Sequence, residues 1–230
     1  MTTAPESVPA AETPPGGGSL FESIRATALR EPADLRAVYE QPGEHALRKQ
    51  VDRIHDVARR LIACSSLVLI ASADAEGHCD VSPRGGPPGL VSVLDEHTLA
   101  IPDATGNKRL DTLHNIVSTG RVGLIFIVPG RDTTLRINGR ACVSTDPRLL
   151  EQLTAVGKPP RSAIVVRAEE VYAHCPKAFL RSSAWKPGNW LAADAAPSSA
   201  EVTLAHLRDP SLTVEMIEQV ERESLLHRYE

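Results

Sequence analysis

The periodicity of the apolar residues changes at Ser66, and this change limits the fold more than any other feature of the sequence. Upstream, Glu44 to Cys64 carries apolar residues three or four positions apart, which predicts one amphipathic helix of about five turns. Downstream, segments of strand length follow one another, and each either alternates apolar with polar residues or is apolar throughout. We expect strands at 67–73, 79–84, 90–102 (a hairpin), 122–128, 134–144 and 163–175.

These strands are not separated by regular helical crossovers, so the pattern disfavours a parallel doubly wound sheet. It favours an antiparallel barrel, closed or partly closed, in the mainly β or α+β class, because closure removes exposed edges. The run VGLIFIV at 122–128 is apolar at every position, so both of its faces should be buried, which supports a contact with a second subunit. Gly139 interrupts an alternating strand and is expected at a bulge or a close backbone approach.

Helical spacing and helix-start residues surround these strands. We expect helices after Leu20 and after Pro32, at 107–118, after Asp146-Pro147, from Pro176, and near 210–228. Residues 1–18 are rich in proline and end in three glycines, which predicts a disordered tail. The chain is therefore expected to contain a tail (1–18), N-terminal helices (19–65), a barrel (66–187), and a linker with a C-terminal helix (188–230).

Charge and cysteine content exclude several classes of protein. The formal net charge of −4 argues against a general nucleic-acid binder, which needs a surplus of cations to neutralise phosphates. The four cysteines show no CxxC spacing, and the N-terminus has no signal-peptide pattern. No stretch approaches the roughly 18 apolar residues of a membrane-spanning helix. We expect a cytoplasmic protein that binds neither nucleic acid nor a membrane.

The segment GNKRLDTLHNI at 106–116 is the strongest candidate for a binding site. Asn107 lies at a predicted loop-to-helix junction, where backbone N–H groups are unpaired and the helix dipole is positive. Lys108 and Arg109 add two cations at the same place, although basic residues are disfavoured at this end of a helix. The combination predicts a phosphate site; the alternative is a solvated basic pair at a helix start.

Two further segments carry residues that could reach a ligand. In SPRGG at 82–86, Arg84 ends a strand just before two glycines, which allow a ligand to approach the backbone closely. In HCPKAFLRSSAW at 174–185, Trp185 beside Arg181 suits a planar aromatic ligand or a subunit interface. Each segment has a simpler explanation. The first could be an ordinary turn at the end of a strand with an exposed arginine, and in the second Trp185 could merely cover the hydrophobic core.

Four segments, in this order and spacing, resemble the pyridoxamine 5′-phosphate oxidase-like superfamily of FMN-binding split barrels, in particular a bacterial branch of FMN-dependent proteins. They are SPRGG (82–86), IPDATGNKRLDTLHNI (101–116), LRINGRA (135–141) and HCPKAFLRSSAW (174–185). The resemblance covers roughly Glu44 to Pro187. In the last segment Ala184 stands where the family usually has leucine before Trp185.

The resemblance implies a split-barrel homodimer with two FMN molecules at the subunit interface. Its implied cofactor-binding residues are Ser82 and Arg84 along the flavin and ribityl chain, Ile101 and Pro102 beside the ring system, Asn107, Lys108, Arg109 and Thr112 at the phosphate, and Arg181, Ser182 and Trp185 from the partner chain.

Other chemistries fit less well. The pairs His78-Cys79 and His174-Cys175 invite a metal interpretation, but adjacent strand residues point to opposite faces, so we expect no metal site. GxSxG and GxGxxG motifs are absent, so any NAD(P)H would act as a diffusible reductant.

The favoured function is an FMN-dependent oxidoreductase acting on a small molecule, in which the flavin transfers the hydride or electrons. The alternatives are a non-catalytic flavin- or haem-binding protein of the same fold, and an oligomeric binding protein with an empty barrel. Oxidation of pyridoxamine phosphate itself is not expected, because no second phosphate-binding cluster is evident. Neither the substrate nor a catalytic side chain can be named from the sequence.

Overall fold

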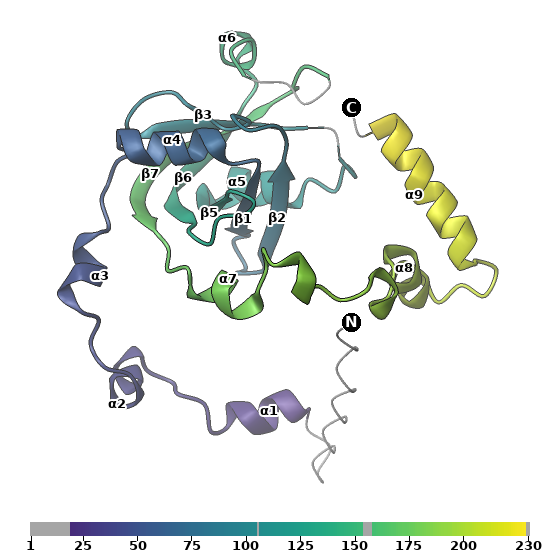
Figure 1. Ribbon diagram of the computed structural model, residues 1–230, viewed down its shortest axis with the longest axis horizontal. Helices are drawn as coiled ribbons and strands as arrows, with labels where there is room; N and C mark the ends of the chain where they lie inside the picture. The colour runs from purple at the N-terminus through teal and green to yellow at the C-terminus, as the bar shows by residue number, and fades with distance from the viewer. Residues whose placement is uncertain (1–18, 105, 154–157, 229–230) are drawn as a thin grey trace.

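The computed structural model describes residues 19–104, 106–153 and 158–228, and its central feature is one seven-stranded sheet (Figure 1). The strand order is β2-β1-β5-β6-β7-β4-β3, and every neighbouring pair is antiparallel. The antiparallel α+β class is therefore confirmed, whereas closure of the barrel and dimerisation stay predictions. The strands are β1 (Leu67–Ala73), β2 (Cys79–Gly85), β3 (Ser92–Val93), β4 (Thr98–Pro102), β5 (Arg121–Ile127), β6 (Leu135–Ser144) and β7 (Ala163–Ala173).

Alternation along the central strands builds the core. In β1, Val68 and Ile70 pair with Phe126 and Leu124 of β5, and Leu124 pairs in turn with Ile137 of β6. All five side chains are at most 1% exposed. Burying an aliphatic or aromatic side chain stabilises the fold by about 1.5–3 kcal/mol. Because a slip of one residue would turn the whole row to solvent, this burial also specifies the register.

The opposite face of β5 is less completely covered. Gly123 and Ile125 are only partly buried in the single chain, although Ile127 at the end of the strand is buried, whereas Val122, Leu124 and Phe126 on the other side are all buried. The predicted burial of both faces of 122–128 is therefore realised on one face within this chain.

Two helices cover the apolar side of the sheet. Helix α4 (Asp56–Cys64) packs against β3 and β6 and buries Ile62. Helix α5 (Asp111–Thr119) packs against β1, β2, β5 and β6 and buries Thr112 and Ile116. Ile62 and Ile116 join the same apolar cluster as the strand residues, so the helices complete a single core.

The prediction of one continuous helix from Glu44 to Cys64 is wrong. The chain forms α3 (Glu44–Arg48) and α4, and between them the Val51 N–H and carbonyl each bond to Val171, at 3.0 and 2.7 Å. The Ile54 N–H donates to the carbonyl of Glu96 at 2.7 Å, and the Ile54 side chain is 2% exposed. These bonds to β7 and to the β3–β4 connection satisfy backbone groups that the helix would otherwise have paired locally, so tertiary contacts override the helical spacing.

Two other helix boundaries differ from prediction. Helix α5 begins at Asp111 rather than near 107, because Lys108 and Leu110 adopt φ values of 64° and 63°, which are incompatible with a right-handed helix. Helix α8 (Ser199–Leu207) forms where only a linker was expected. Ser198 begins it with a capping box to Glu201, a local signal that the sequence contains.

The remaining helical segments lie on the outside of the sheet. Every residue from Ser19 to Gln50 is exposed, and Figure 1 shows this segment as an arc beside the strands. None of the helices that the structure describes combines the length and apolar character that a bilayer crossing demands. The predicted tail at 1–18 lies outside the described residues. The remaining helical segments outside the sheet are α1 (Leu20–Arg25), η1 (Pro32–Asp34), α2 (Leu35–Val38), α6 (Pro147–Leu150), α7 (Lys177–Ser182), η2 (Pro187–Asn189), η3 (Ala193–Ala195) and α9 (Val214–Arg228).

Gly139 lies at the bulge predicted in β6. The register with β7 shifts between Asn138 and Gly139, and a Cβ added at Gly139 would lie 1.9 Å from the carbonyl oxygen of Arg167. Only glycine lets the two backbones approach this closely, so the residue is required by space rather than by φ.

We expect Gly139→Ala to lower the free energy of unfolding by about 2 kcal/mol or more, because the contacted atom is backbone and can yield only by distorting the ladder. Urea denaturation measures this change. Gly188→Ala is the matched control, since no atom lies within 4 Å of its added Cβ. Equal stability of the two variants would contradict the conclusion that space beside Arg167 requires glycine at position 139.

Candidate functional site

Strand β2 presents three polar side chains on one face. Asp80, Ser82 and Arg84 are partly buried, whereas the residues between them are exposed. Alternation explains this, because residues two apart in a strand point to the same side. The Arg84 guanidinium donates a hydrogen bond of 2.5 Å from Nη1 to the Ser82 hydroxyl. Ser82 and Arg84, both named from the sequence, therefore act together on the face that meets α5.

Helix α5 is attached to this face by side-chain hydrogen bonds. The Thr112 hydroxyl donates to Oδ2 of Asp80 at 2.6 Å, and the Asn115 amide donates to the Ser72 hydroxyl at 3.1 Å. Residues 82–86 and 106–116, far apart in the chain, are thereby brought together at one edge of the sheet. Thr112 itself is 3% exposed, so its hydroxyl is committed to Asp80.

The end of β4 joins the same cluster. Ile101 and Pro102 are buried and pair with Ile164 and Ala163 of β7, and the Ile101 side chain belongs to the main apolar core. Asp103 follows directly and is partly buried. Burial raises the pKa of the Asp103 carboxyl, and the nearby positive charge of Arg84 opposes that rise. Arg84 therefore bonds to Ser82 and lies near enough to Asp103 to influence the charge of that carboxyl.

Lys108 and Arg109 lie in the turn before α5 rather than in the helix. Asn107 stabilises this turn by accepting a 3.0 Å hydrogen bond from the backbone N–H of Arg109. Arg109 is exposed and donates from Nε to Asp111 at 2.8 Å, and this contact raises the pKa of the guanidinium. Lys108 makes no ion pair with any described residue. Its ammonium is therefore available to a ligand, whereas Arg109 already has a carboxylate partner.

The first turn of α5 offers unpaired donors. Leu110 precedes the helix in a left-handed conformation and supplies no side-chain cap. No described residue accepts a hydrogen bond from the backbone N–H groups of Asp111, Thr112 or Leu113. These amides lie next to Lys108 and Arg109 in the chain, so the helix start can hold an anion.

The remaining predicted residues lie on or beside α7, and no hydrogen bond, ion pair or ring contact between described residues joins them to this cluster. Arg181 and Ser182 are exposed on α7. The Trp185 indole donates to the carbonyl of Arg131 at 2.9 Å and stacks on Phe179, with ring centroids 5.6 Å apart. Within one chain, the structure therefore does not bring these three side chains to Lys108 and Arg109.

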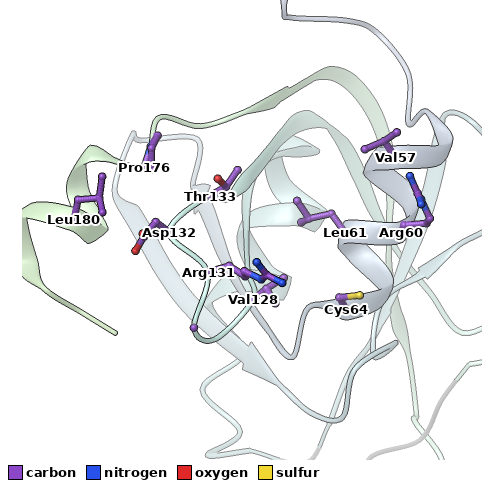
Figure 2. A pocket seen from close by; sticks show the side chains of 11 residues that line it. Val57, Arg60, Leu61, Cys64, Val128, Arg131, Asp132, Thr133, Pro176 and Leu180 are labelled. Atoms are coloured by element: carbon purple, nitrogen blue, oxygen red, sulfur yellow. The ribbon is translucent and has the colours of Figure 1, made fainter. Parts of the chain in front are cut away.

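A groove of about 680 Å³ opens beside α7, and sequence reasoning did not anticipate it (Figure 2). Helix α4, the β5–β6 connection and the start of α7 form its walls. Its lining residues are Val57, Arg60, Leu61, Cys64, Val128, Gly130, Arg131, Asp132, Thr133, Pro176 and Leu180.

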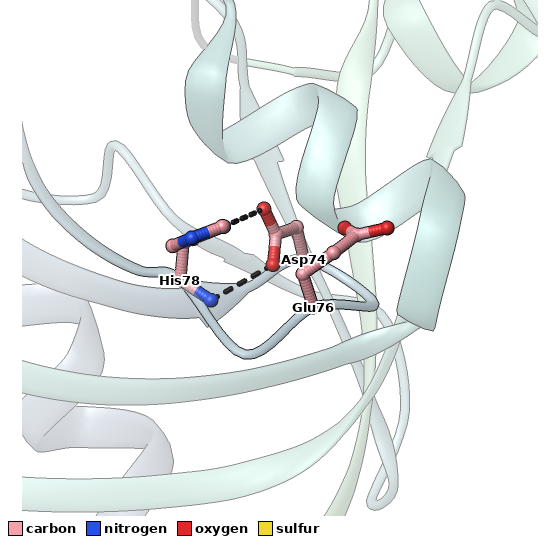
Figure 3. A group of neighbouring side chains, drawn as sticks. All are labelled: Asp74, Glu76 and His78. Atoms are coloured by element: carbon pink, nitrogen blue, oxygen red, sulfur yellow. Dashed lines mark hydrogen bonds and ion pairs between the residues drawn. The ribbon is translucent and has the colours of Figure 1, made fainter.

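Asp74, Glu76 and His78 form the one group of potential metal-ligating side chains found among the described residues (Figure 3). Asp74 accepts hydrogen bonds of 2.8 Å from both the backbone N–H and the ring Nδ1 of His78, whereas Glu76 takes part in neither. These contacts lower the pKa of Asp74. They also stabilise the β1–β2 turn, where Gly77 has a φ of 89°. The turn accounts for the cluster, and we assign no metal to it.

Asp80 and Asp103 are members of the candidate site that sequence reasoning missed. The signal for Asp80 was its place two residues before Ser82 in an alternating strand. Asp103 directly follows Ile101-Pro102 within a segment that had already been singled out. Neither residue was assigned a role, because its partner comes from another part of the chain.

Comparisons with known proteins agree with this architecture. A family model described as pyridoxamine 5′-phosphate oxidase matches residues 54–175, which is more than half of the 230 residues. The chain therefore belongs to the pyridoxamine 5′-phosphate oxidase family. No match is found among curated proteins.

Solved structures with similarity to the chain include three bacterial proteins. HupZ of Group A Streptococcus is 20% identical and covers 52% of this chain and 93% of its own, with a TM-score of 0.42. A Lactobacillus delbrueckii protein, with a proposed pyridoxamine 5′-phosphate oxidase activity, is 24% identical over 53% and 95% of the two chains, with a TM-score of 0.42. A Clostridium acetobutylicum protein related to general stress protein 26 is 15% identical over 51% and 85%, with a TM-score of 0.40.

The raised pKa of Asp103 gives a pH-dependent prediction. Because the folded state holds this proton more tightly than the unfolded chain does, the charged carboxylate costs stability at neutral pH. We expect Asp103→Asn to be more stable than the wild type at about pH 7 and the difference to shrink below about pH 4, where both states of the wild type become protonated.

Urea denaturation of both proteins across this pH range measures the effect. Asp194→Asn, at an exposed position, is the control and should leave stability almost unchanged. A less stable Asp103→Asn protein at neutral pH would show that attraction to Arg84 outweighs the cost of burial.

Proposed function

We propose that this protein binds FMN at the β2–α5 edge and works as an FMN-dependent oxidoreductase on a small molecule. One observation carries the proposal: the Thr112 hydroxyl donates to Asp80, which joins the helix that follows Lys108 and Arg109 to the strand that carries Ser82 and Arg84. Membership of the pyridoxamine 5′-phosphate oxidase family supports the same function.

The donors at this edge fit the phosphate end of FMN. They comprise the free ammonium of Lys108, the guanidinium of Arg109 and the uncapped N–H groups at the start of α5. A phosphate prefers this combination of charge-assisted side-chain bonds and fixed backbone amides. Arg109 would have to share its guanidinium between Asp111 and the ligand.

The remaining residues suit the other parts of the molecule. Ser82 and Arg84 offer a hydroxyl and a cation on one face of β2. These two groups would bind the hydroxyls of the ribityl chain. The backbone at Ile101 and Pro102, whose side chains are buried, would form a rigid wall beside the ring system. When bound, the flavin supplies the hydride or electron transfer, and this chain binds and orients it.

A homodimer would complete the site, with Arg181, Ser182 and Trp185 contributed by the partner. Two features support this part of the proposal. No hydrogen bond or ring contact among the described residues joins these side chains to Lys108 within one chain, and the outer face of β5 is only partly covered at Gly123 and Ile125. The substrate would then meet the flavin between the subunits, with NAD(P)H as a diffusible reductant.

Replacing the basic pair tests the phosphate site. We expect Lys108→Ala combined with Arg109→Ala to weaken FMN binding by about tenfold or more, because both side-chain cations are removed from the phosphate. Flavin absorbance after dialysis and titration of the stripped protein measure this. The combination of Arg25→Ala and Arg30→Ala is the control, since it removes the same charge from the exposed N-terminal segment. Full retention of FMN by the first variant would place the phosphate elsewhere.

Mixed dimers test the shared site. A chain with Lys108→Ala and Arg109→Ala, paired with a chain carrying Arg181→Ala and Ser182→Ala, should contain one intact site of the two. We expect the purified mixed dimer to bind half the flavin of the wild type, while each variant alone binds little. Reduction of the bound flavin by NAD(P)H, followed by turnover of an acceptor, then separates an enzyme from a flavin carrier.

A further inference from the structure

The groove beside α7 is built from three segments that are far apart in the sequence (Figure 2). Val57, Leu61 and Cys64 lie along one side of α4, at helical spacing. The β5–β6 connection forms the second wall, and Leu180 of α7 lies on the third. Its volume of about 680 Å³ falls within the range of about 300–1,000 Å³ that small-molecule sites occupy.

The apolar lining is aliphatic. Val57 and Leu180 are 68% and 49% exposed, and both line the same hollow with Leu61 and Val128. No phenyl, phenol, indole or imidazole ring is among the lining residues. Exposed branched side chains gathered around one hollow favour contact with a flexible hydrocarbon, whereas a planar aromatic ligand would gain from a ring to stack upon.

Two guanidinium groups of the groove lack partners. Arg60 and Arg131 make no ion pair and no side-chain hydrogen bond with any described residue. Elsewhere Arg121 and Arg140 both pair with Glu169, at 2.7 and 2.8 Å. The lining contains one carboxylate, Asp132, against these two cations, so the groove carries a net positive charge.

We propose that this groove is a binding site for an aliphatic carboxylate, a class of ligand that none of the assigned FMN residues serves. The carboxylate would accept bidentate hydrogen bonds from the guanidinium of Arg60 or Arg131, the geometry in which arginine binds such groups most strongly. The hydrocarbon would cover Val57, Leu61 and Leu180, removing apolar surface from water.

A tryptophan next to the groove can report occupancy. Trp185 donates its indole N–H to the carbonyl of Arg131, so a ligand that engages Arg131 changes the surroundings of this ring. The other tryptophan, Trp190, bonds to the carbonyl of Ala184 and does not line the groove. Trp190→Phe therefore isolates the signal of Trp185.

The test is calorimetric titration of the full chain, as purified and with saturating FMN, using decanoate below its micelle concentration. We expect binding with about one decanoate per chain, accompanied by a change in the emission of Trp185. Acetate and decanol each lack one half of the ligand, and we expect both to bind at least about tenfold more weakly than decanoate.

Variants assign the site. Arg60→Gln and Arg131→Gln should each weaken decanoate binding by about tenfold, because each removes a charge-assisted contact. Leu61 is partly buried against the core, so Val57→Ser, at a more exposed position, is the better test of the apolar wall and should weaken binding too. Arg53→Gln, at an exposed arginine outside the groove, is the control and should leave decanoate binding unchanged.

Three results would overturn the proposal. The first is equal affinity of the arginine variants and the wild type. The second is displacement of decanoate by FMN, which would make the groove part of the flavin site. The third is binding only when dilution dissociates the protein, which would make the groove an interface between two copies of the chain. The Lys108 and Arg109 double variant can lose FMN and still be titrated with decanoate. Failure of the FMN proposal is therefore distinguishable from failure of the groove proposal.

Discussion

The hydrogen bond from Thr112 to Asp80 is the contact on which the candidate site depends. It joins the first turn of α5 to the edge strand β2, and the bond from Asn115 to Ser72 holds the next turn of the helix against β1. Among the described residues, no other side-chain hydrogen bond joins residues 106–116 to β2. A neutral donor in a short bond to a partly buried carboxylate is directional, so it sets the rotation of α5 as well as its position.

Charge balance within this cluster shapes what it can bind. Arg84, Lys108 and Arg109 bring three cations, and Asp80, Asp103 and Asp111 bring three carboxyls. Arg109 is paired with Asp111 and Arg84 lies near Asp103, whereas Lys108 pairs with no described carboxylate, so the positive charge that is free to attract an anion belongs chiefly to Lys108 and the start of α5. Anion binding at this edge is therefore a competition between the ligand and the resident carboxylates for the same cations.

Helix α7 connects the groove to the proposed subunit interface. It carries Arg181 and Ser182, which the resemblance places at a partner's flavin, while Leu180 lines the groove next to α4. Trp185 ties the end of this segment to the β5–β6 connection through the carbonyl of Arg131. A ligand in the groove and a flavin at the interface would therefore contact different side chains of one short element.

The amino-acid sequence was enough to predict the strands, because alternation is a property of neighbouring residues, and it also predicted the bulge at Gly139 and the strand that carries Ser82 and Arg84. It also singled out Asn107, Lys108 and Arg109 by their local chemistry. Three features depend on contacts between remote segments: Val51 leaves the helical path to pair with Val171, Leu110 delays the start of α5, and Asp80 and Asp103 join the cluster. The groove likewise exists only where three distant segments meet. Periodicity is encoded within a few neighbouring residues, whereas a hydrogen bond between remote groups depends on which surfaces the folded chain brings into contact.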